Sequence, residues 1–226
     1  MSTSREPFLQ RVRQALQASN RPGQTRALEN RGSIGYQGAG ADPALRFRDE
    51  FTAAGGNAHL VPDRGAAVDK VLELARHVQA RRILLGCGAV IDSLALAEPL
   101  KALGGEVFPA KAIAPESGRD ALFAADLAVT GVEFLIAETG SMVVIASPDE
   151  PRSLSLLPPV HIAVADRAQL VPDLFDLFAM KRWTEPPGMP SCLTLITGPS
   201  KTGDIELKLV TGVHGPGEVH VVLVCG

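Results

Sequence analysis

The sequence predicts an α/β protein of three layers, in which a mixed, mostly parallel sheet carries helices on both faces. Between residues 43 and 108, short apolar runs typical of buried strands alternate with segments of helical periodicity. This alternation is typical of parallel strands joined by crossover helices. With 226 residues, the chain is long enough to bury the core of one such domain, and nothing in its composition requires a second.

The helices and strands can be assigned in chain order from hydrophobic periodicity. Helices are expected over residues 43–54, 66–79, 94–103, 119–125 and 170–180, and strands over 58–61, 82–86, 106–108, 126–130, 161–164, 191–196 and 219–224. Pro43 suits the first turn of the first helix, and Gly55-Gly56 ends that helix. In the second helix, Val68, Leu72 and Ala75 are expected on the buried face.

Residues 134–145 form two apolar runs around a Thr139-Gly140 step, which predicts a β-hairpin with a two-residue turn. Strands that follow one another with so little helix imply an antiparallel portion of the sheet. Glu138 adds a full charge to an apolar row, and Gly140 leaves backbone N–H groups open beside it, so the turn is a candidate site. Glu133 lies at an odd offset from Glu138, which makes the two carboxylates a poor acid–base pair.

A second candidate site is the glycine- and hydroxyl-rich segment 197–204, which follows a strand. Ser200, Lys201 and Thr202 would precede a helix that begins at Ile205 and turns Leu209 inward, and free N–H groups at a helix start favour an anion. The spacing does not match the nucleotide-binding Walker pattern. Asp204 either joins this anion site or caps the helix.

His214 lies in a turn-rich loop between Gly212 and Pro216, where it has either a ligand or proton-transfer role or a structural one. Loops beside strand ends are where α/β sheets collect ligand-binding groups. We therefore expect one pocket, with two catalytic groups and a set of anion-binding groups. The catalytic groups would be Glu138 and His214, and the anion-binding groups would be Thr139, Gly140, Ser200, Lys201, Thr202 and Asp204.

The loop Gly86-Cys87-Gly88 also follows a strand and precedes a helix. It lacks the third glycine of a dinucleotide-binding motif, so a tight turn is favoured over a ligand site. The three cysteines Cys87, Cys192 and Cys225 are widely separated, which argues for structural thiols, against a metal site, and against a cluster bound by this chain alone.

Charge divides the chain into residues 1–40, a basic helix and linker, and residues 41–226, the α/β domain. The first segment holds six Arg and two Glu, a charge of +4 within a total of −3. It either contacts an acidic surface or is a solvated helix and linker. With 4% aromatic residues, nucleic-acid stacking is not expected. No apolar run reaches ~20 residues and no signal peptide is recognised, so a cytoplasmic protein is expected.

Four motifs follow one another along some 180 residues: 137–141 (AETGS), 155–162 (SLLPPVHI), 197–206 (TGPSKTGDIE) and 212–216 (GVHGP). In this order they resemble the LUD-domain family, specifically its lactate utilisation protein C group. The resemblance implies the fold shared by ribose-phosphate isomerase, CoA transferases and formyltetrahydrofolate cyclo-ligase, which agrees with the α/β pattern above.

The resemblance also implies a function: a cytoplasmic component of the oxidation of L-lactate to pyruvate, acting with separate iron–sulfur subunits. Cluster, haem and flavin motifs are missing from this sequence, so no cofactor is expected on this chain. Its ligand would be a small carboxylate or phosphate. Two alternatives remain: a stand-alone acyl- or CoA-transferase-like enzyme with Glu138 as nucleophile, by analogy of fold, and a non-catalytic scaffold.

Overall fold

The computed structural model describes residues 5–19, 38–113, 118–186, 188–203 and 209–226. The chain forms two compact units, residues 1–36 and 37–226. The first contains helix α1 (Arg5–Ser19), on which Phe8 and Val12 are exposed. No described helix combines the length and the apolar character needed to cross a bilayer.

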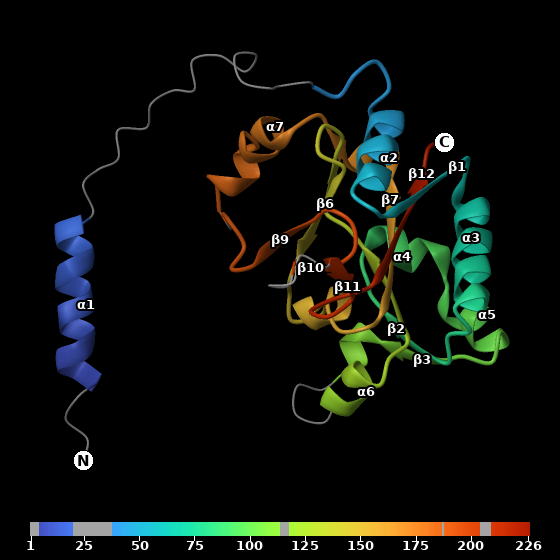
Figure 1. Ribbon diagram of the computed structural model, residues 1–226, viewed down its shortest axis with the longest axis horizontal. Helices are drawn as coiled ribbons and strands as arrows, with labels where there is room; N and C mark the ends of the chain where they lie inside the picture. The colour runs from blue at the N-terminus through green and yellow to red at the C-terminus, as the bar shows by residue number, and fades with distance from the viewer. Residues whose placement is uncertain (1–4, 20–37, 114–117, 187, 204–208) are drawn as a thin grey trace. The chain divides into compact units, whose positions relative to one another are not determined.

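The second unit alternates strands and helices (Figure 1). Its helices are α2 (Pro43–Ala53), α3 (Arg64–His77), α4 (Ala89–Leu94), α5 (Ala97–Ala102), α6 (Arg119–Phe123) and α7 (Leu174–Phe178), with 3-10 turns η1 (Ala110–Ala112), η2 (Arg152–Ser155), η3 (Arg167–Gln169) and η4 (Lys181–Trp183). Its strands are β1 (Asn57–Val61), β2 (Arg82–Leu85), β3 (Glu106–Pro109), β4 (Leu127–Gly131), β5 (Phe134–Ile136), β6 (Ser141–Ile145), β7 (Val160–Asp166), β8 (Leu170–Val171), β9 (Leu193–Ile196), β10 (Lys201–Gly203), β11 (Leu209–Thr211) and β12 (Glu218–Val224).

A parallel sheet of six strands, in the order β1-β12-β7-β4-β2-β3, forms the centre of this unit. The last strand, β12, lies between β1 and β7, so that Val222 is opposite both His59 and Val164. Central parallel strands are buried on both faces, which explains the continuous apolar run of β12. Strand β1 is therefore joined to the rest of the sheet only through the C-terminal strand β12.

The two faces of the sheet carry different layers. One face packs on α3, α4 and α5 through an aliphatic core that includes Val71, Leu100 and Val129. The other face packs on α2 and on the β5–β6 hairpin, where Phe47 and Leu135 are fully buried. Figure 1 shows α3 and α5 on the side of the sheet opposite to β6 and β9. The predicted three-layer α/β fold is confirmed.

Helix α2 is fixed against the hairpin by a close backbone contact. Asp42 caps the helix by accepting the N–H of Ala44 at 3.0 Å. Gly140 in the hairpin turn has φ +60°, and a Cβ there would lie 2.3 Å from the backbone nitrogen of Phe51. Only glycine allows this approach, because it has no side chain and adopts a positive φ without strain.

The antiparallel strands form a separate sheet in the order β8-β5-β6-β9. The predicted hairpin of β5 and β6 is confirmed, but its two-residue turn is wrong: Ile136 is opposite Ser141, so residues 137–140 form the loop. The cause is a tertiary contact. The N–H groups of Ala137 and Glu138 donate to the carbonyls of Val171 and Pro172 at 2.9 and 3.0 Å, which draws the chain away from β6.

Two predicted helices start later than expected. The expected helix 94–103 begins only at Ala97, as α5, because the preceding helix α4 ends at Leu94 and Ala95 adopts the left-handed conformation with φ 46°. The expected helix 170–180 begins as strand β8, which pairs with β5, and Asp173 then caps the short α7. In the second case strand pairing overrode the local helix propensity.

The helix expected from Ile205 is also wrong where it can be described. Leu209 lies in strand β11 and is opposite Gly203 of β10, in an antiparallel pair. The anion-binding N–H groups of a helix start are therefore not formed at Leu209. In α3, the buried face contains Ala67, Val71, Leu74 and Ala75, whereas Val68 and Leu72, which we expected there, are only partly buried.

We predict that His161 makes the fold sensitive to acid. Burial, and to a lesser degree His220, lowers the pKa of His161 from 6.5 to about 4. Because the folded pKa lies below the unfolded one, stability is intact above pH 6.5 and decreases as the pH falls towards 4, by about 3 kcal/mol at most. Urea unfolding from pH 7.5 to 4.5 should show a flatter decrease in His161→Gln than in wild type.

The matched control is His214→Gln, which changes an exposed histidine. Its unfolding free energy should depend on pH as steeply as that of the wild type. The comparison uses the slope of the unfolding free energy against pH rather than its absolute value, because His161 also bonds Thr130 at 2.8 Å and the variant loses that contact. Parallel curves for His161→Gln and wild type would contradict the prediction.

Candidate functional site

A cleft of the second unit lies at the carboxyl ends of β2 and β4. These strands are neighbours in the sheet, yet β2 leads into α4 on one face and β4 leads into β5 on the other. Neighbouring strands whose connections leave to opposite faces open a crevice between them, and ligands of open α/β sheets bind there. We name this space, of about 340 Å³, the switch-point cleft.

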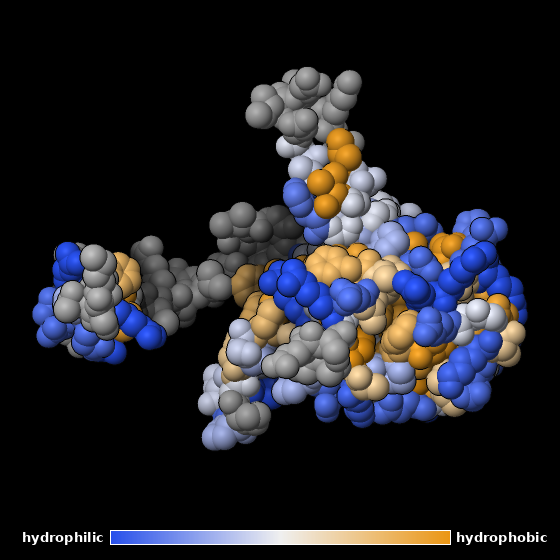
Figure 2. Space-filling view, turned by 90° about the horizontal axis from the view of Figure 1, so that it is seen from below, coloured by the Kyte–Doolittle hydropathy of each residue, from blue (hydrophilic) through white to orange (hydrophobic). Residues whose placement is uncertain are grey.

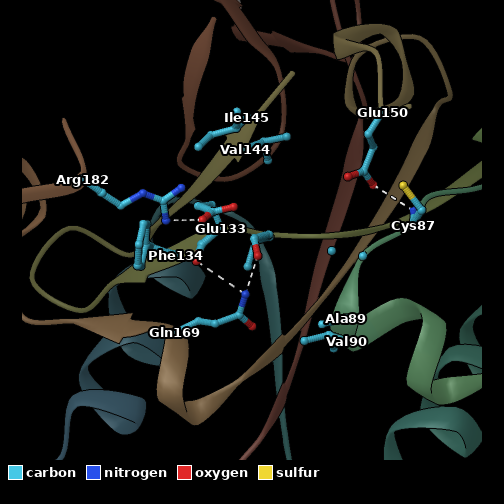
Figure 3. Close-up of a pocket in the computed structure, with 13 residues that line it drawn as sticks. Cys87, Ala89, Val90, Glu133, Phe134, Val144, Ile145, Glu150, Gln169 and Arg182 are labelled. Atoms are coloured by element: carbon cyan, nitrogen blue, oxygen red, sulfur yellow. Dashed lines mark hydrogen bonds and ion pairs between the residues drawn. The ribbon is translucent and has the colours of Figure 1, made fainter. Parts of the chain in front are cut away.

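The lining comes from six segments. It consists of Cys87, Gly88, Ala89 and Val90 after β2, Gly131, Val132, Glu133 and Phe134 from the end of β4 to the start of β5, Val144 and Ile145 on β6, Glu150, Gln169 and Arg182. Figure 3 shows Glu150 and Cys87 on one side of the cleft and Arg182, Glu133 and Phe134 on the other. The cleft therefore has one carboxylate on each side, Glu150 and Glu133, and the guanidinium of Arg182 on the same side as Glu133.

Glu150 is seated on the loop after β2. Its Oε1 accepts the N–H of Cys87 at 3.3 Å, and a Cβ at residue 86 would lie 2.3 Å from that oxygen. The absence of a side chain at Gly86 is thus what admits the carboxylate. A tight turn holds Glu150 from the other side. The backbone N–H of Glu150 donates to both the carbonyl and the hydroxyl oxygen of Ser147, at 3.2 and 3.0 Å.

The surroundings of Glu150 disfavour its charge. Burial raises the pKa of Glu150 from 4.5 to about 7, and the carboxylates of Asp92 and Glu133 act in the same direction. The Cys87 N–H and Lys111 oppose this increase without cancelling it. A carboxyl group with a pKa near 7 is poised to accept or donate a proton at neutral pH.

Arg182 lies across the cleft from Glu150 and is held by aromatic rings. Its Cζ lies 5.4 Å from the centre of the Phe134 ring and 4.7 Å from that of Trp183, and its Nη1 pairs with Glu133. Trp183 is itself anchored by donating its ring N–H to Leu177 O. A guanidinium held on two rings can exchange one carboxylate partner for another without moving far.

Gln169 fixes the connection between β4 and β5. Its amide nitrogen donates to Val132 O and, at 3.5 Å, to Glu133 O, while its carbonyl accepts the N–H of Asp166 at 2.8 Å. Figure 3 shows the first two bonds running from the Gln169 amide nitrogen to two neighbouring carbonyl groups of this connection. Gln169 therefore determines the direction in which Glu133 enters the cleft.

Cys87 supplies a neutral thiol to the same cleft. Burial raises the pKa of Cys87, and the Glu150 carboxylate raises it further. The thiol, rather than the nucleophilic thiolate, is the form present at neutral pH. Within the described chain, no group of three His, Cys, Asp or Glu side chains is placed to hold a metal ion.

The residues predicted from the sequence lie elsewhere, and the structure unites only some of them. Ser200 and His214 line a separate cleft of about 280 Å³, together with Thr197. Thr139 is linked to this cleft by a chain of two hydroxyl hydrogen bonds. Thr139 Oγ1 donates to Ser141 Oγ at 2.8 Å, and Ser141 Oγ in turn lies 2.6 Å from Thr197 Oγ1.

The other predicted groups have different surroundings. Glu138 accepts the N–H of Gly38 at 3.4 Å, and Lys201 donates to Ala54 O at the end of α2. Thr202 is opposite Val210 in the β10–β11 pair. None of these, nor Gly140, is part of the lining of the Ser200–His214 cleft. Asp204 lies outside the described residues.

Sequence reasoning missed the groups that line the switch-point cleft. The loop Gly86-Cys87-Gly88, which follows a strand, is the signal in the sequence that points to this cleft. The sequence relates Glu133 only to Glu138, whereas the ion-pair partner of Glu133 in the structure is Arg182. Glu150 comes from the loop after β6 and Arg182 from the 3-10 turn η4 after α7, and no sequence period relates them to β2.

Comparison with known proteins identifies the family. The model of the LUD domain matches residues 44–224. Lactate utilization protein C of Bacillus subtilis is 40% identical over 102 residues, which are 44% of this chain and 42% of that protein. The protein of the same name from Geobacillus kaustophilus is 34% identical over 165 residues, 67% of this chain and 69% of that protein.

The alignment with Bacillus licheniformis lactate utilization protein C, at 39% identity, likewise spans less than half of that relative, 42% of its length. A crystal structure of a DUF162 family protein from Deinococcus radiodurans has a TM-score of 0.55 at 22% identity and covers 80% of this chain and 96% of that one. That likeness supports the fold. Because the family model covers most of its length, the chain belongs to the LUD-domain family.

Proposed function

We propose that this chain is a cytoplasmic component of L-lactate utilisation that binds a small 2-hydroxy or 2-oxo carboxylate in the switch-point cleft. The observation that carries the proposal is the placement of Arg182 and Glu150 on opposite sides of one cleft at strand ends. A 2-hydroxy acid presents a carboxylate and a hydroxyl on adjacent carbons. The cleft offers a cation for the first and a proton-exchanging carboxyl group for the second.

Each group has a distinct role in this proposal. The ligand carboxylate takes the place of Glu133 on Arg182, and the aromatic rings of Phe134 and Trp183 keep the guanidinium in position. Glu150 hydrogen-bonds the hydroxyl group of the ligand and exchanges its proton, and a pKa near 7 suits that exchange. The oxidation itself, which removes two electrons and the hydrogen on the hydroxyl-bearing carbon, is assigned to the separate iron–sulfur subunits.

The names of the relatives support the lactate part of this proposal, since the Bacillus and Geobacillus proteins are called lactate utilization protein C. The alternative with Glu138 as the nucleophile of an acyl transferase has less support. Glu138 is not part of the lining of the switch-point cleft. We therefore assign proton exchange to Glu150.

We predict that Arg182→Gln weakens the binding of lactate and pyruvate. Losing a charged hydrogen bond costs about 1.5 to 3 kcal/mol, roughly a tenfold to hundredfold loss of affinity. Titration calorimetry measures it, and Lys181→Gln, which removes the same charge from an exposed neighbour, is the matched control. Glu133→Gln should bind both acids more tightly than wild type, because Arg182 loses its competing partner. Equal affinities in all four proteins would contradict the assignment.

We predict that Glu150→Gln stabilises the protein at high pH while it removes the pH dependence of lactate binding. The folded pKa of Glu150, about 7, lies above the unfolded value of 4.5. The associated stability is therefore present below pH 4.5 and lost as the pH rises through 7. After allowance for solvent screening, Glu150→Gln should be about 1 to 2 kcal/mol more stable than wild type at pH 8.

Thermal melts and calorimetry at pH 6 and pH 8 provide the two measurements, with Asp149→Asn as the control on an exposed neighbouring carboxylate. The Glu150 variant should combine higher stability at pH 8 with a flat binding profile. A variant that keeps the wild-type profile between these pH values would remove Glu150 from the proton-exchange role.

The partner part of the proposal is tested by purification from lactate-grown cells. Affinity-tagged chain should retain iron–sulfur proteins, whereas the isolated chain should be colourless and without stoichiometric iron. The physical reason is that Cys87, Cys192 and Cys225 are too few for the four thiolates of a cluster. Cluster absorbance from the isolated chain, or recovery without iron-containing proteins, would refute this part.

A further inference from the structure

A second cleft of about 290 Å³ adjoins the switch-point cleft, and we name it the side cleft. It lies at the carboxyl ends of β2 and β3, beneath the turn that joins α4 to α5. Cys87 lines both clefts. The two spaces therefore meet at the turn that follows β2.

The interior of the side cleft is apolar. Leu85, Ile91, Leu96 and Ala110 line it, and each of them is at least 93% buried. Its charged lining residues, Asp92 and Lys111, are both exposed, so their charges reach solvent at the rim. Such a lining favours an uncharged apolar group over a second anion.

The junction of the two clefts is the Gly86-Cys87 turn, on which the Glu150 carboxyl group is seated. Cys87 is common to both linings, and its thiol lies 3.9 Å from the carbonyl oxygen of Asp149. A neutral thiol behaves as a small apolar group, and Gly86 has no side chain. An acid whose hydroxyl group meets Glu150 therefore has its own side chain beside the side cleft.

The size of the clefts decides the kind of ligand. Lactate has six heavy atoms, and even if each took the ~30 Å³ of a whole water molecule, lactate would fill no more than roughly 180 Å³. The switch-point cleft alone measures about 340 Å³, and the side cleft adds a further 290 Å³. Lactate would leave most of this space unoccupied, and its methyl group would make few of the available apolar contacts.

We infer that the site accepts 2-hydroxy acids whose apolar side chain is larger than a methyl group, with that side chain in the side cleft. The inference rests on the proposed function, because it takes Arg182 and Glu150 as the groups that hold the head of the acid. The length of the acid's apolar side chain, and not a second charged group on the acid, then determines which 2-hydroxy acid binds most tightly. 2-Hydroxyisocaproate and phenyllactate carry the required chemistry: one carboxylate, one hydroxyl and a branched aliphatic or aromatic group.

Calorimetric titration of the full chain with lactate, 2-hydroxyisocaproate and phenyllactate tests the inference. Each CH₂ that becomes buried raises affinity roughly fourfold, so both larger acids should bind at least tenfold more tightly than lactate. Equal or weaker binding of the larger acids, in a protein that binds lactate, would overturn the inference and leave the proposed function standing. Failure to bind any of the three acids would refute the proposed function itself.

A variant that fills the side cleft locates the effect. Ala97 lines this cleft at the start of α5, and Ala97→Phe should abolish the advantage of the larger acids while lactate affinity stays within twofold of wild type. The control is Ala102→Phe, at the exposed end of the same helix and outside the cleft lining. Circular-dichroism melts establish that both variants fold. If Ala97→Phe leaves the tenfold advantage intact, the side cleft is not where the side chain binds.

Discussion

The opposite departures of two neighbouring strands are the constraint on which the site depends. Strands β2 and β4 run parallel and side by side, but the chain leaves β2 towards α4 and leaves β4 towards the second sheet. No element can cover both exits, so a crevice remains at their ends. The glycine loop after β2, the Glu133 segment after β4 and the cleft between them all follow from this arrangement.

The second sheet has a function beyond covering the core. Strands β5 and β6 are tied to α2 through Gly140, and the same sheet carries the segments that deliver Arg182 and Glu150 to the cleft. Burial raises the pKa of Glu150, and carboxyl groups with perturbed pKa values cluster at functional sites.

The prediction from sequence succeeded where local pattern and tertiary packing agreed. The apolar residues of the run Val219–Val224 predict a strand by themselves, and it is an interior strand of the parallel sheet, between β1 and β7. It failed where a distant partner intervened. Leu170 pairs with Leu135 instead of starting a helix, and Leu209 pairs with Gly203. Pairing of strands that are far apart in the chain leaves no periodic signal in either one.

The sequence by itself determined the α/β class, most strands and helices of the second unit and, through four ordered motifs, the family resemblance. Only the tertiary structure decided which polar residues meet. Glu133 and Arg182 are 49 positions apart, and Cys87 and Glu150 are 63 apart, yet each pair is in contact. The physical reason is that periodicity records which face of an element is buried, whereas contacts between loops depend on the order in which strands enter the sheet.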